Sequence, residues 1–410
     1  MQDLGGFLFF ERLKKALKWI FISCAVGALT GTASAFFLLS LEFITDTRLN
    51  HPWLLYLLPV AGLIIVFFYS RFGEKVEAGN NLILEQIHDP KEKIPLRMWP
   101  LIWGGTLLTH LCGGSAGREG TAVQMGGAIA DQFTAVCKLT TTERKLLLMT
   151  GIAGGFASVF GTPWAAAIFG IEVLALGRIQ YRGLGPCLMS AFTAHFVCLL
   201  WGARHTPYQN LVGLIPDFGF SALAFSAAVG VLFGLCAFIF SWSHHRLSAL
   251  LKKKIPSISL RVVAGGLFII TLSLILNTHR YLGLGIPPLI ESFQSPSPSY
   301  DFALKILFTV ITLASGFKGG EVTPLFFIGA TLGSALSLIL PLPTGFLAAL
   351  GFVAVFAGAA NTPLACILMA MELFGADIGL YAALAIVVSY LCSGNRGIYH
   401  SQKLEVGKYA

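Results

Sequence analysis

The sequence predicts an all-α, polytopic membrane protein built from two structurally related halves with many tilted and broken helices. Three observations lead to this fold class. The 410 residues are 55% hydrophobic and only 12% charged, whereas a soluble domain carries roughly 25% charged residues. Long apolar runs recur along the whole chain, and two segments about 200 residues apart repeat the same order of glycine, proline and glutamate. No polar stretch is long enough for a soluble regulatory domain, so residues 1–410 are expected to form one transmembrane domain.

Five apolar runs account for the membrane spans. Each is long enough to cross, or nearly cross, a hydrocarbon layer of roughly 30 Å. These runs are Trp19–Leu41, Trp53–Tyr69, Leu184–Trp201, Phe218–Phe240 and Val262–Leu276.

The formal charge of +8 reflects membrane topology rather than nucleic-acid binding. The basic residues cluster in short links between apolar runs, at 12–18, 91–97, 138–145 and 244–254. Such a bias marks cytoplasmic loops and predicts a cytoplasmic N-terminus in the bacterial inner membrane. Residues 1–19 do not resemble a cleavable signal; they are expected to form either an amphipathic helix at the inner surface or an ordinary juxtamembrane segment. The eight cysteines lack metal or disulfide spacing, and no metal or cofactor is indicated.

The two halves align without gaps over their most informative segments. Residues 151–177 match residues 351–377 at an offset of 200, which places Glu172 on Glu372. Residues 117–128 match residues 319–330 at an offset of 202, which places Glu119 on Glu321. We therefore expect a first repeat over about 15–201 and a second over about 217–392. Repeats in transporters are often inverted around an ion site near the middle of the membrane.

The matched segments break their helices with glycine or proline, in "GGSAGREGT", "FGTPW", "FKGGEVTP" and "ANTPL". Irregular backbone at membrane depth is tolerated where it is buried in protein or lines a watery cavity. The start of a helix leaves N–H groups unpaired and carries a partial positive charge. Several such starts that converge on one point predict an anion site.

Glu119 is the most unusual residue of this region, because carboxylates at membrane depth are costly. One interpretation is structural: an ion pair between Arg118 and Glu119 that locks the loop. The other is functional: the carboxylate competes with a permeant anion for the same amide donors and carries a proton when it leaves them. In the second interpretation Arg118 anchors the loop backbone more than it binds the ion.

The motifs resemble the CLC family of chloride channels and anion/proton antiporters over about residues 15–405. The resemblance rests on "GREGT" (117–121), "VQMGG" (123–127), "GGEVTP" (319–324) and "NTPLA" (361–365) with a glutamate after it. It implies that Glu119 is the gating and proton-carrying residue. It also implies an all-helical fold, a helix near 397–406 and a homodimer with one pathway per subunit. The anion-binding set that it implies is Gly117, Arg118, Gly120, Thr121, Val322, Thr323 and Tyr399.

Departures from the family pattern point to one branch of it. Thr121 replaces a proline, Asn80 stands where an ion-facing serine is usual, and Val322 replaces an aromatic residue. This combination resembles the fluoride-exporting branch of the CLC antiporters. Lys318, just before the second motif, is a possible pathway charge. Asn80 could equally be the N-cap of a helix that starts at "NLILEQI", and both roles can hold together.

The proton route on the inner side is left open by the sequence. The internal relay glutamate of the chloride antiporters aligns with Val173, and only the neighbouring Glu172 is acidic. Glu172 and Glu372, at matching positions of equivalent helices, are expected to be structural, either as caps of partner loops or at helix ends.

The predicted function is fluoride/proton antiport across the cytoplasmic membrane. The alternative is a chloride or other anion/proton antiporter, or an anion channel, of the same family. A membrane enzyme or scaffold is disfavoured because the sequence has no intramembrane HExxH motif and no paired aspartates. The expected partners are the anion, protons and the lipid bilayer.

Overall fold

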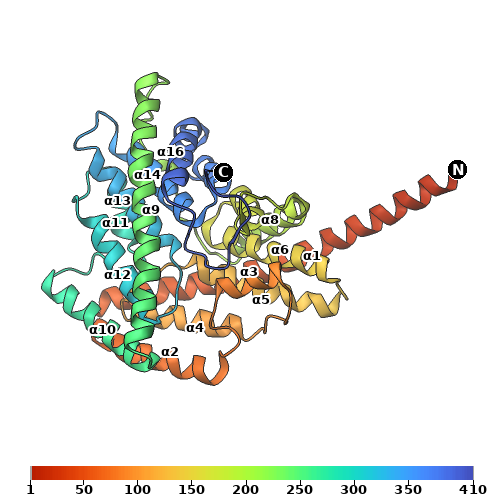
Figure 1. Cartoon of the computed structure of the whole chain (residues 1–410), viewed down its shortest axis with the longest axis horizontal. Coiled ribbons are helices and arrows are strands. Elements are labelled where there is room, and N and C mark those ends of the chain that lie inside the picture. The colour runs from red at the N-terminus through yellow and green to blue at the C-terminus, as the bar shows by residue number, and fades with distance from the viewer. Residues whose placement is uncertain (1, 410) are drawn as a thin grey trace.

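The computed structural model describes the backbone of residues 2–409 and the side chains of residues 10–409. Sixteen α-helices, short 3-10 turns and one two-stranded sheet make up this part of the chain (Figure 1). The first-half helices are α1 (Gln2–Asn50), α2 (Leu58–Phe72), α3 (Asn80–His88), α4 (Met98–Leu111), α5 (Glu119–Val136), α6 (Thr141–Phe160), α7 (Pro163–Glu172) and α8 (Leu184–Leu200). The second-half helices are α9 (Phe220–Lys254), α10 (Ile258–Ile275), α11 (Ile286–Gln294), α12 (Asp301–Ser315), α13 (Val322–Leu336), α14 (Thr344–Ala360), α15 (Pro363–Phe374) and α16 (Gly379–Cys392).

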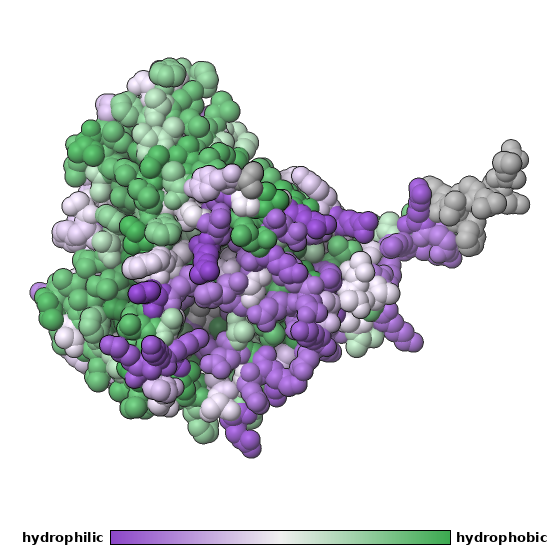
Figure 2. Space-filling model, in the orientation of Figure 1, coloured by the Kyte–Doolittle hydropathy of each residue, from purple (hydrophilic) through white to green (hydrophobic). Residues whose placement is uncertain are grey.

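The all-α, polytopic fold class predicted from the sequence is confirmed. Five helical segments are long and apolar enough to cross a membrane, and each contains most or all of one predicted span. They tilt in different directions, as α1 and α9 show most clearly in Figure 1. Hydrophobic residues dominate the surface around α9 and α10, whereas hydrophilic residues gather on the face that carries α3 and the C-terminal tail (Figure 2).

The N-terminal segment belongs to the first span rather than to a separate surface helix. α1 continues without a break from Gln2 to Asn50, and its N-terminal end projects from the body of the molecule (Figure 1). Lys18, at the base of the apolar run, forms an ion pair with Glu143 in the first turn of α6 at 3.1 Å. The first span is therefore tied to the α5–α6 link on the side that the sequence predicts to be cytoplasmic.

Helices α7 and α15, which the sequence aligns with one another, pack side by side in opposite directions. The Glu172 carboxylate at the end of α7 accepts hydrogen bonds from the amides of Leu364 (2.9 Å) and Ala365 (2.8 Å) at the start of α15. The Glu372 carboxylate near the end of α15 accepts hydrogen bonds from the amides of residues 164 (3.0 Å) and 165 (2.8 Å) at the start of α7. Each glutamate thus satisfies the orphan donors of the other helix, in the structural role expected for this pair.

Glycines set the spacing of the helix pairs α5–α6 and α13–α14. A Cβ atom at Gly126 would lie 2.2 Å from the carbonyl oxygen of Gly151, and one at Gly329 would lie 2.0 Å from that of Gly351. No side chain fits at such distances. The backbones of both pairs therefore approach closely in the same way, as small residues allow between membrane helices.

The prediction of a C-terminal helix over about 397–406 is wrong. β2 (Lys403–Leu404) lies parallel to β1 (Ala175–Leu176), and the rest of the tail is irregular. The tail amides find partners elsewhere: Ile398 N donates to the Ala359 oxygen at 2.8 Å, and Lys403 N donates to the Leu174 oxygen at 3.2 Å. Because these bonds run to other segments, the tail amides are satisfied without a helical ladder.

Candidate functional site

The Glu119 carboxylate lies buried at the start of α13, although Glu119 itself begins α5. The residue is 1% exposed. Its Oε2 atom accepts hydrogen bonds from Thr323 Oγ1 (2.6 Å), Thr323 N (3.0 Å) and Arg118 N (3.3 Å). Two of these donors are amides close to helix starts, which favour a negative charge. The carboxylate thus occupies a position that suits an anion.

The second carboxylate oxygen is held much less firmly. Glu119 Oε1 has no hydrogen-bond partner in the described part of the chain. Arg118 Nε lies 3.6 Å from it, which makes an ion pair but no hydrogen bond. The ion pair of the structural interpretation therefore exists, but it is looser than the bonds to Thr323. A buried acceptor left without a partner is costly, so this end of the side chain is the easier one to move.

Two helix starts meet at a short backbone bridge below Glu119. Gly117 N donates to the Gly320 oxygen at 2.6 Å, and Gly320 N donates to the Gly117 oxygen at 2.9 Å. A Cβ atom at Gly117 would lie 2.9 Å from the Pro324 ring, and one at Gly320 would lie 2.9 Å from the Gly120 nitrogen. Glycine is therefore required on both sides of the bridge.

The bridge leaves several amide donors free. In the described part of the chain, no backbone hydrogen bond starts from the amides of Glu119, Gly120, Thr121 and Val322. These four residues lie in the first turns of α5 and α13, where a helix has no acceptor for its amides. Unpaired N–H groups at converging helix starts form an anion site without a basic side chain. The Thr121 hydroxyl shares a hydrogen bond with Thr106 Oγ1 at 2.8 Å, and Val322 is 1% exposed. The amide groups, more than the side chains, are available to an anion.

A cavity of about 160 Å³ lies beside this cluster. It is lined by Asn80, Lys318, Glu321 and Tyr399 among others. Asn80 begins α3, but Gly79 with a φ of +60° is the N-cap, and the Asn80 side chain makes no capping bond. The N-cap interpretation of Asn80 is therefore wrong. Its Nδ2 atom instead faces Gly120, where a Cβ would lie 3.0 Å away, and its buried Oδ1 atom has no described partner.

Lys318 contributes its charge to the wall of the same cavity. Its Nζ atom lies 4.1 Å from the centre of the Tyr69 ring, in a cation–π contact. Glu321, which the repeat aligns with Glu119, lies close to Gly120: a Cβ there would be 4.0 Å from Glu321 Oε2. Tyr399 packs edge-on against Phe169, with ring centres 6.4 Å apart. The sequence flagged Glu321 only through its repeat position and did not foresee its place in the cavity.

A second cavity, of about 210 Å³, lies on the other side of the Arg118–Glu119 pair. Arg118 and Arg204 line it together with Glu42 and Asp46 near the end of α1. Arg118 therefore faces this second cavity, whereas Asn80 and Glu321, the neighbours of Gly120, face the first. Glu119 lies between Arg118 and Gly120 in the chain, but it lines neither cavity.

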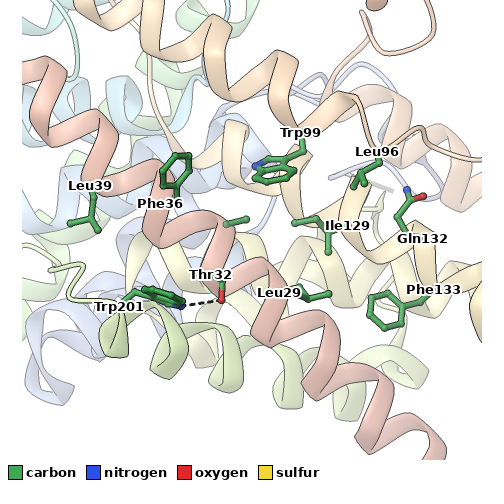
Figure 3. Close-up of a pocket in the computed structure, with 11 residues that line it drawn as sticks. Leu29, Thr32, Phe36, Leu39, Leu96, Trp99, Ile129, Gln132, Phe133 and Trp201 are labelled. Atoms are coloured by element: carbon green, nitrogen blue, oxygen red, sulfur yellow. Dashed lines mark hydrogen bonds between the residues drawn. The ribbon is translucent and has the colours of Figure 1, made fainter.

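A larger cavity elsewhere has a different character. It encloses about 590 Å³ between α1, α4 and α5 near the end of α8. Figure 3 shows its apolar and aromatic lining, with a single hydrogen bond from Trp201 Nε1 to Thr32 Oγ1 of 3.1 Å. None of the predicted site residues lines it. Its lining is almost entirely apolar, and its size does not make it the site.

A buried ion pair fixes the loop that follows Asn80 and α3. The Arg144 guanidinium donates to Asp131 Oδ1 and Oδ2, both at 2.7 Å, and to the Glu92 oxygen at 2.7 Å. Asp131 Oδ2 also accepts from Ile94 N at 2.6 Å. Sequence reasoning missed this clamp, since Asp131 and Arg144 look like ordinary residues of a basic link.

The fold and the site together define a polytopic helical membrane protein with broken helices around a buried carboxylate and free amides. The family model described as voltage gated chloride channel matches residues 61–394. The chain is 52% identical over 399 residues to the chloride/fluoride channel protein of Pseudomonas syringae pv. tomato, covering 96% of this chain and 88% of that one. The chain therefore belongs to the CLC family of voltage-gated chloride channels and related transporters.

Solved structures agree with this assignment. A crystal structure of a CLC-type fluoride/proton antiporter matches with a TM-score of 0.91 and 34% identity, over 95% of this chain and 98% of that one. A slow cyanobacterial Cl⁻/H⁺ antiporter matches with a TM-score of 0.80 and 19% identity, over 93% and 96% of the two chains. The second likeness concerns the fold alone.

Proposed function

We propose that this protein exports fluoride in exchange for protons. The observation that carries the proposal is the position of Glu119. Its carboxylate accepts hydrogen bonds from the Thr323 amide (3.0 Å) and the Thr323 hydroxyl (2.6 Å). An anion that takes these donors displaces the carboxylate, which then accepts a proton. One side chain thereby couples the two ions. The similarity of this chain to a chloride/fluoride channel protein and to a CLC-type fluoride/proton antiporter supports the same function.

The choice of fluoride over chloride rests on the donors around the site. Fluoride is small and strongly hydrated, so close and strong donors must replace its water. Asn80 offers an amide group next to Gly120, and the hydroxyls of Thr323 and Thr121 lie at the two helix starts. We place the bound fluoride in the space between these donors and Tyr399. Lys318 is a nearby charge in the wall of the same cavity.

We also propose how the chain is organised in the membrane. The antiparallel packing of α7 and α15 supports two inverted repeats, over about 15–201 and 217–392, within one transmembrane domain. The basic links at 91–97, 138–145 and 244–254 support a cytoplasmic N-terminus in the inner membrane. The cavity lined by Asn80, which also reaches His244, then opens to the cytoplasm. Family membership supports a homodimer with one pathway in each subunit.

Flux measurements test the function directly. Purified protein in liposomes loaded with potassium fluoride is expected to release fluoride while protons enter, as a fluoride electrode and a pH electrode record together. The same liposomes loaded with potassium chloride are expected to release chloride far more slowly. Chloride release as fast as fluoride release would favour the alternative function of a chloride antiporter. Fluoride release without proton movement would favour a channel.

A further inference from the structure

Basic side chains from three separate segments line one cavity between α3, α6 and the C-terminal tail. They are Lys145 in the second turn of α6, Arg182 in the turn before α8, and Lys403 in β2. The cavity encloses about 230 Å³, far more than the roughly 10–15 Å³ that one water molecule needs. None of the residues assigned above to the fluoride site lines it.

Hydrogen bonds between the same segments hold the walls of this cavity together. The oxygen of Leu174, in the link after α7, accepts hydrogen bonds from His88 Nε2 (2.9 Å) and Lys403 N (3.2 Å). Lys145 Nζ donates to the His88 oxygen at 3.3 Å. The end of α3, the start of α6 and the tail therefore meet at this cavity, although they lie far apart in the sequence.

The three basic side chains have no acidic partner. None of them forms an ion pair with a described residue, and no described acidic side chain lines the cavity. Asp89, Glu143 and Glu405 lie beside lining residues in the sequence, but each pairs with a basic residue outside the cavity. These partners are Lys91 (2.9 Å), Lys18 (3.1 Å) and Arg178 (3.8 Å). Positive charges that converge without a counter-charge repel one another, so an anionic ligand is stabilised between them.

The chemistry of the cavity suits the phosphate of a lipid better than a free ion. Arginine and lysine are the usual donors to phosphate. Lys145 uses one of its three N–H donors on the His88 oxygen, which leaves two for a ligand. The rest of the lining is largely apolar and includes the buried side chains of Ile87, Met149 and Leu174. A free ion uses only the charges, whereas a phospholipid also covers this apolar floor.

The cavity lies where a membrane span begins. The candidate span Tyr181–Leu200 starts one residue before Arg182, and Tyr181 is 71% exposed. Exposed tyrosines are typical of the interface between hydrocarbon and water. Lys145 belongs to the basic link 138–145, so the orientation proposed above puts the cavity on the cytoplasmic side. Basic pockets between membrane helices on that side bind the headgroups of anionic lipids.

We propose that Lys145, Arg182 and Lys403 bind the phosphate of an anionic phospholipid from the inner leaflet. The phosphate accepts hydrogen bonds from the three basic side chains, and the glycerol of the lipid covers the apolar floor. The bound lipid ties the tail to α6 and to the start of α8. The inference rests on the proposed orientation in the membrane and not on the identity of the transported anion.

Native mass spectrometry of the full-length protein in detergent tests the site. Separate samples receive phosphatidylglycerol, phosphatidylcholine or soluble glycerol phosphate, which distinguishes a lipid headgroup from a free phosphate. The test variant carries Arg182→Gln and Lys403→Gln, two exposed residues. The matched control carries Lys253→Gln and Lys254→Gln, which remove the same charge from the exposed end of α9 outside the cavity. Wild type and control are expected to bind phosphatidylglycerol alike, and the test variant roughly 30-fold more weakly.

Three outcomes would overturn the proposal. Equal binding of phosphatidylglycerol by wild type and the test variant would exclude the site. An equal loss in both double variants would show that general surface charge holds the lipid. Glycerol phosphate or phosphatidylcholine bound as tightly as phosphatidylglycerol would exclude an anionic lipid as the ligand.

The experiment is independent of transport. Selective lipid binding by a protein that fails to exchange fluoride in liposomes would support the lipid site and refute the proposed function. Normal fluoride exchange with unselective lipid binding would refute the lipid site and leave the proposed function standing.

Discussion

Replacement of Glu119 by glutamine removes the charge from the carboxylate and keeps the shape of the side chain. In the structure, Oε2 makes two short bonds to Thr323, of 2.6 and 3.0 Å. Hydrogen bonds to a charged group contribute about 1.5–3 kcal/mol each, and neutral ones about 0.5–1.5 kcal/mol. Over two bonds the difference is about 2–3 kcal/mol. The amide side chain should therefore compete with the anion roughly 30- to 150-fold less well than the carboxylate.

Two consequences follow for transport by Glu119→Gln. Calorimetry should show that the variant binds the anion up to roughly 150-fold more tightly than wild type, because glutamine competes for the amides less well than the carboxylate. Proton movement should disappear, because the amide does not titrate. The assay is the liposome experiment with fluoride and pH electrodes, with wild type measured in parallel. Proton uptake that continues at the wild-type ratio to fluoride release would refute the reasoning, since the proposed function assigns the proton to Glu119.

Three further changes test the surroundings of the site. Asn80→Ser should reduce the preference for fluoride over chloride in liposome flux, because it removes the amide that faces Gly120; an unchanged preference would place selectivity elsewhere. Glu372→Ala should lower the thermal unfolding midpoint in detergent by several degrees, because two amides at the start of α7 lose charge-assisted bonds of about 1.5–3 kcal/mol each. The same change at exposed Glu74 is the control. Arg144→Met should destabilise the protein by about 3–5 kcal/mol, because it leaves the charge of Asp131 buried without its ion-pair partner. Adding Asp131→Leu should restore much of the lost stability. A double variant as unstable as Arg144→Met would contradict this account.

The spans were predictable because hydrocarbon imposes a length and a composition on each of them. Their ends were less predictable. The apolar run that ends at Phe240 continues as helix to Lys254, since a helix that leaves the membrane keeps its backbone bonds while its side chains become basic. The prediction of a C-terminal helix was wrong because the hydrogen-bond partners of the tail, Ala359 and Leu174, are distant in sequence. Local sequence shows neither partner.

The candidate site was predictable in its residue types but not in its geometry. The glycines and the helix starts around Glu119 are visible in the sequence, and the structure brings them together. The sequence does not show which oxygen of Glu119 is hydrogen-bonded, because its partner Thr323 is distant in the chain. It also does not show that Gly79, rather than Asn80, caps α3. The buried partners Thr106 and Arg144 carry no motif at all, because any residue that reaches the right atom could serve.

The two pairs of repeated glutamates show where the halves have kept their symmetry and where they have lost it. Glu172 and Glu372 have the same role: each accepts hydrogen bonds from two amides at the start of the other's antiparallel partner helix. Symmetry of this kind suits a structural role, because both helices need the same cap. Glu119 and Glu321 have diverged: one lies on the amides of α13, and the other lines the cavity with Asn80. Under the proposed function, the pair that has lost its symmetry is therefore the pair that contains the coupling carboxylate, Glu119.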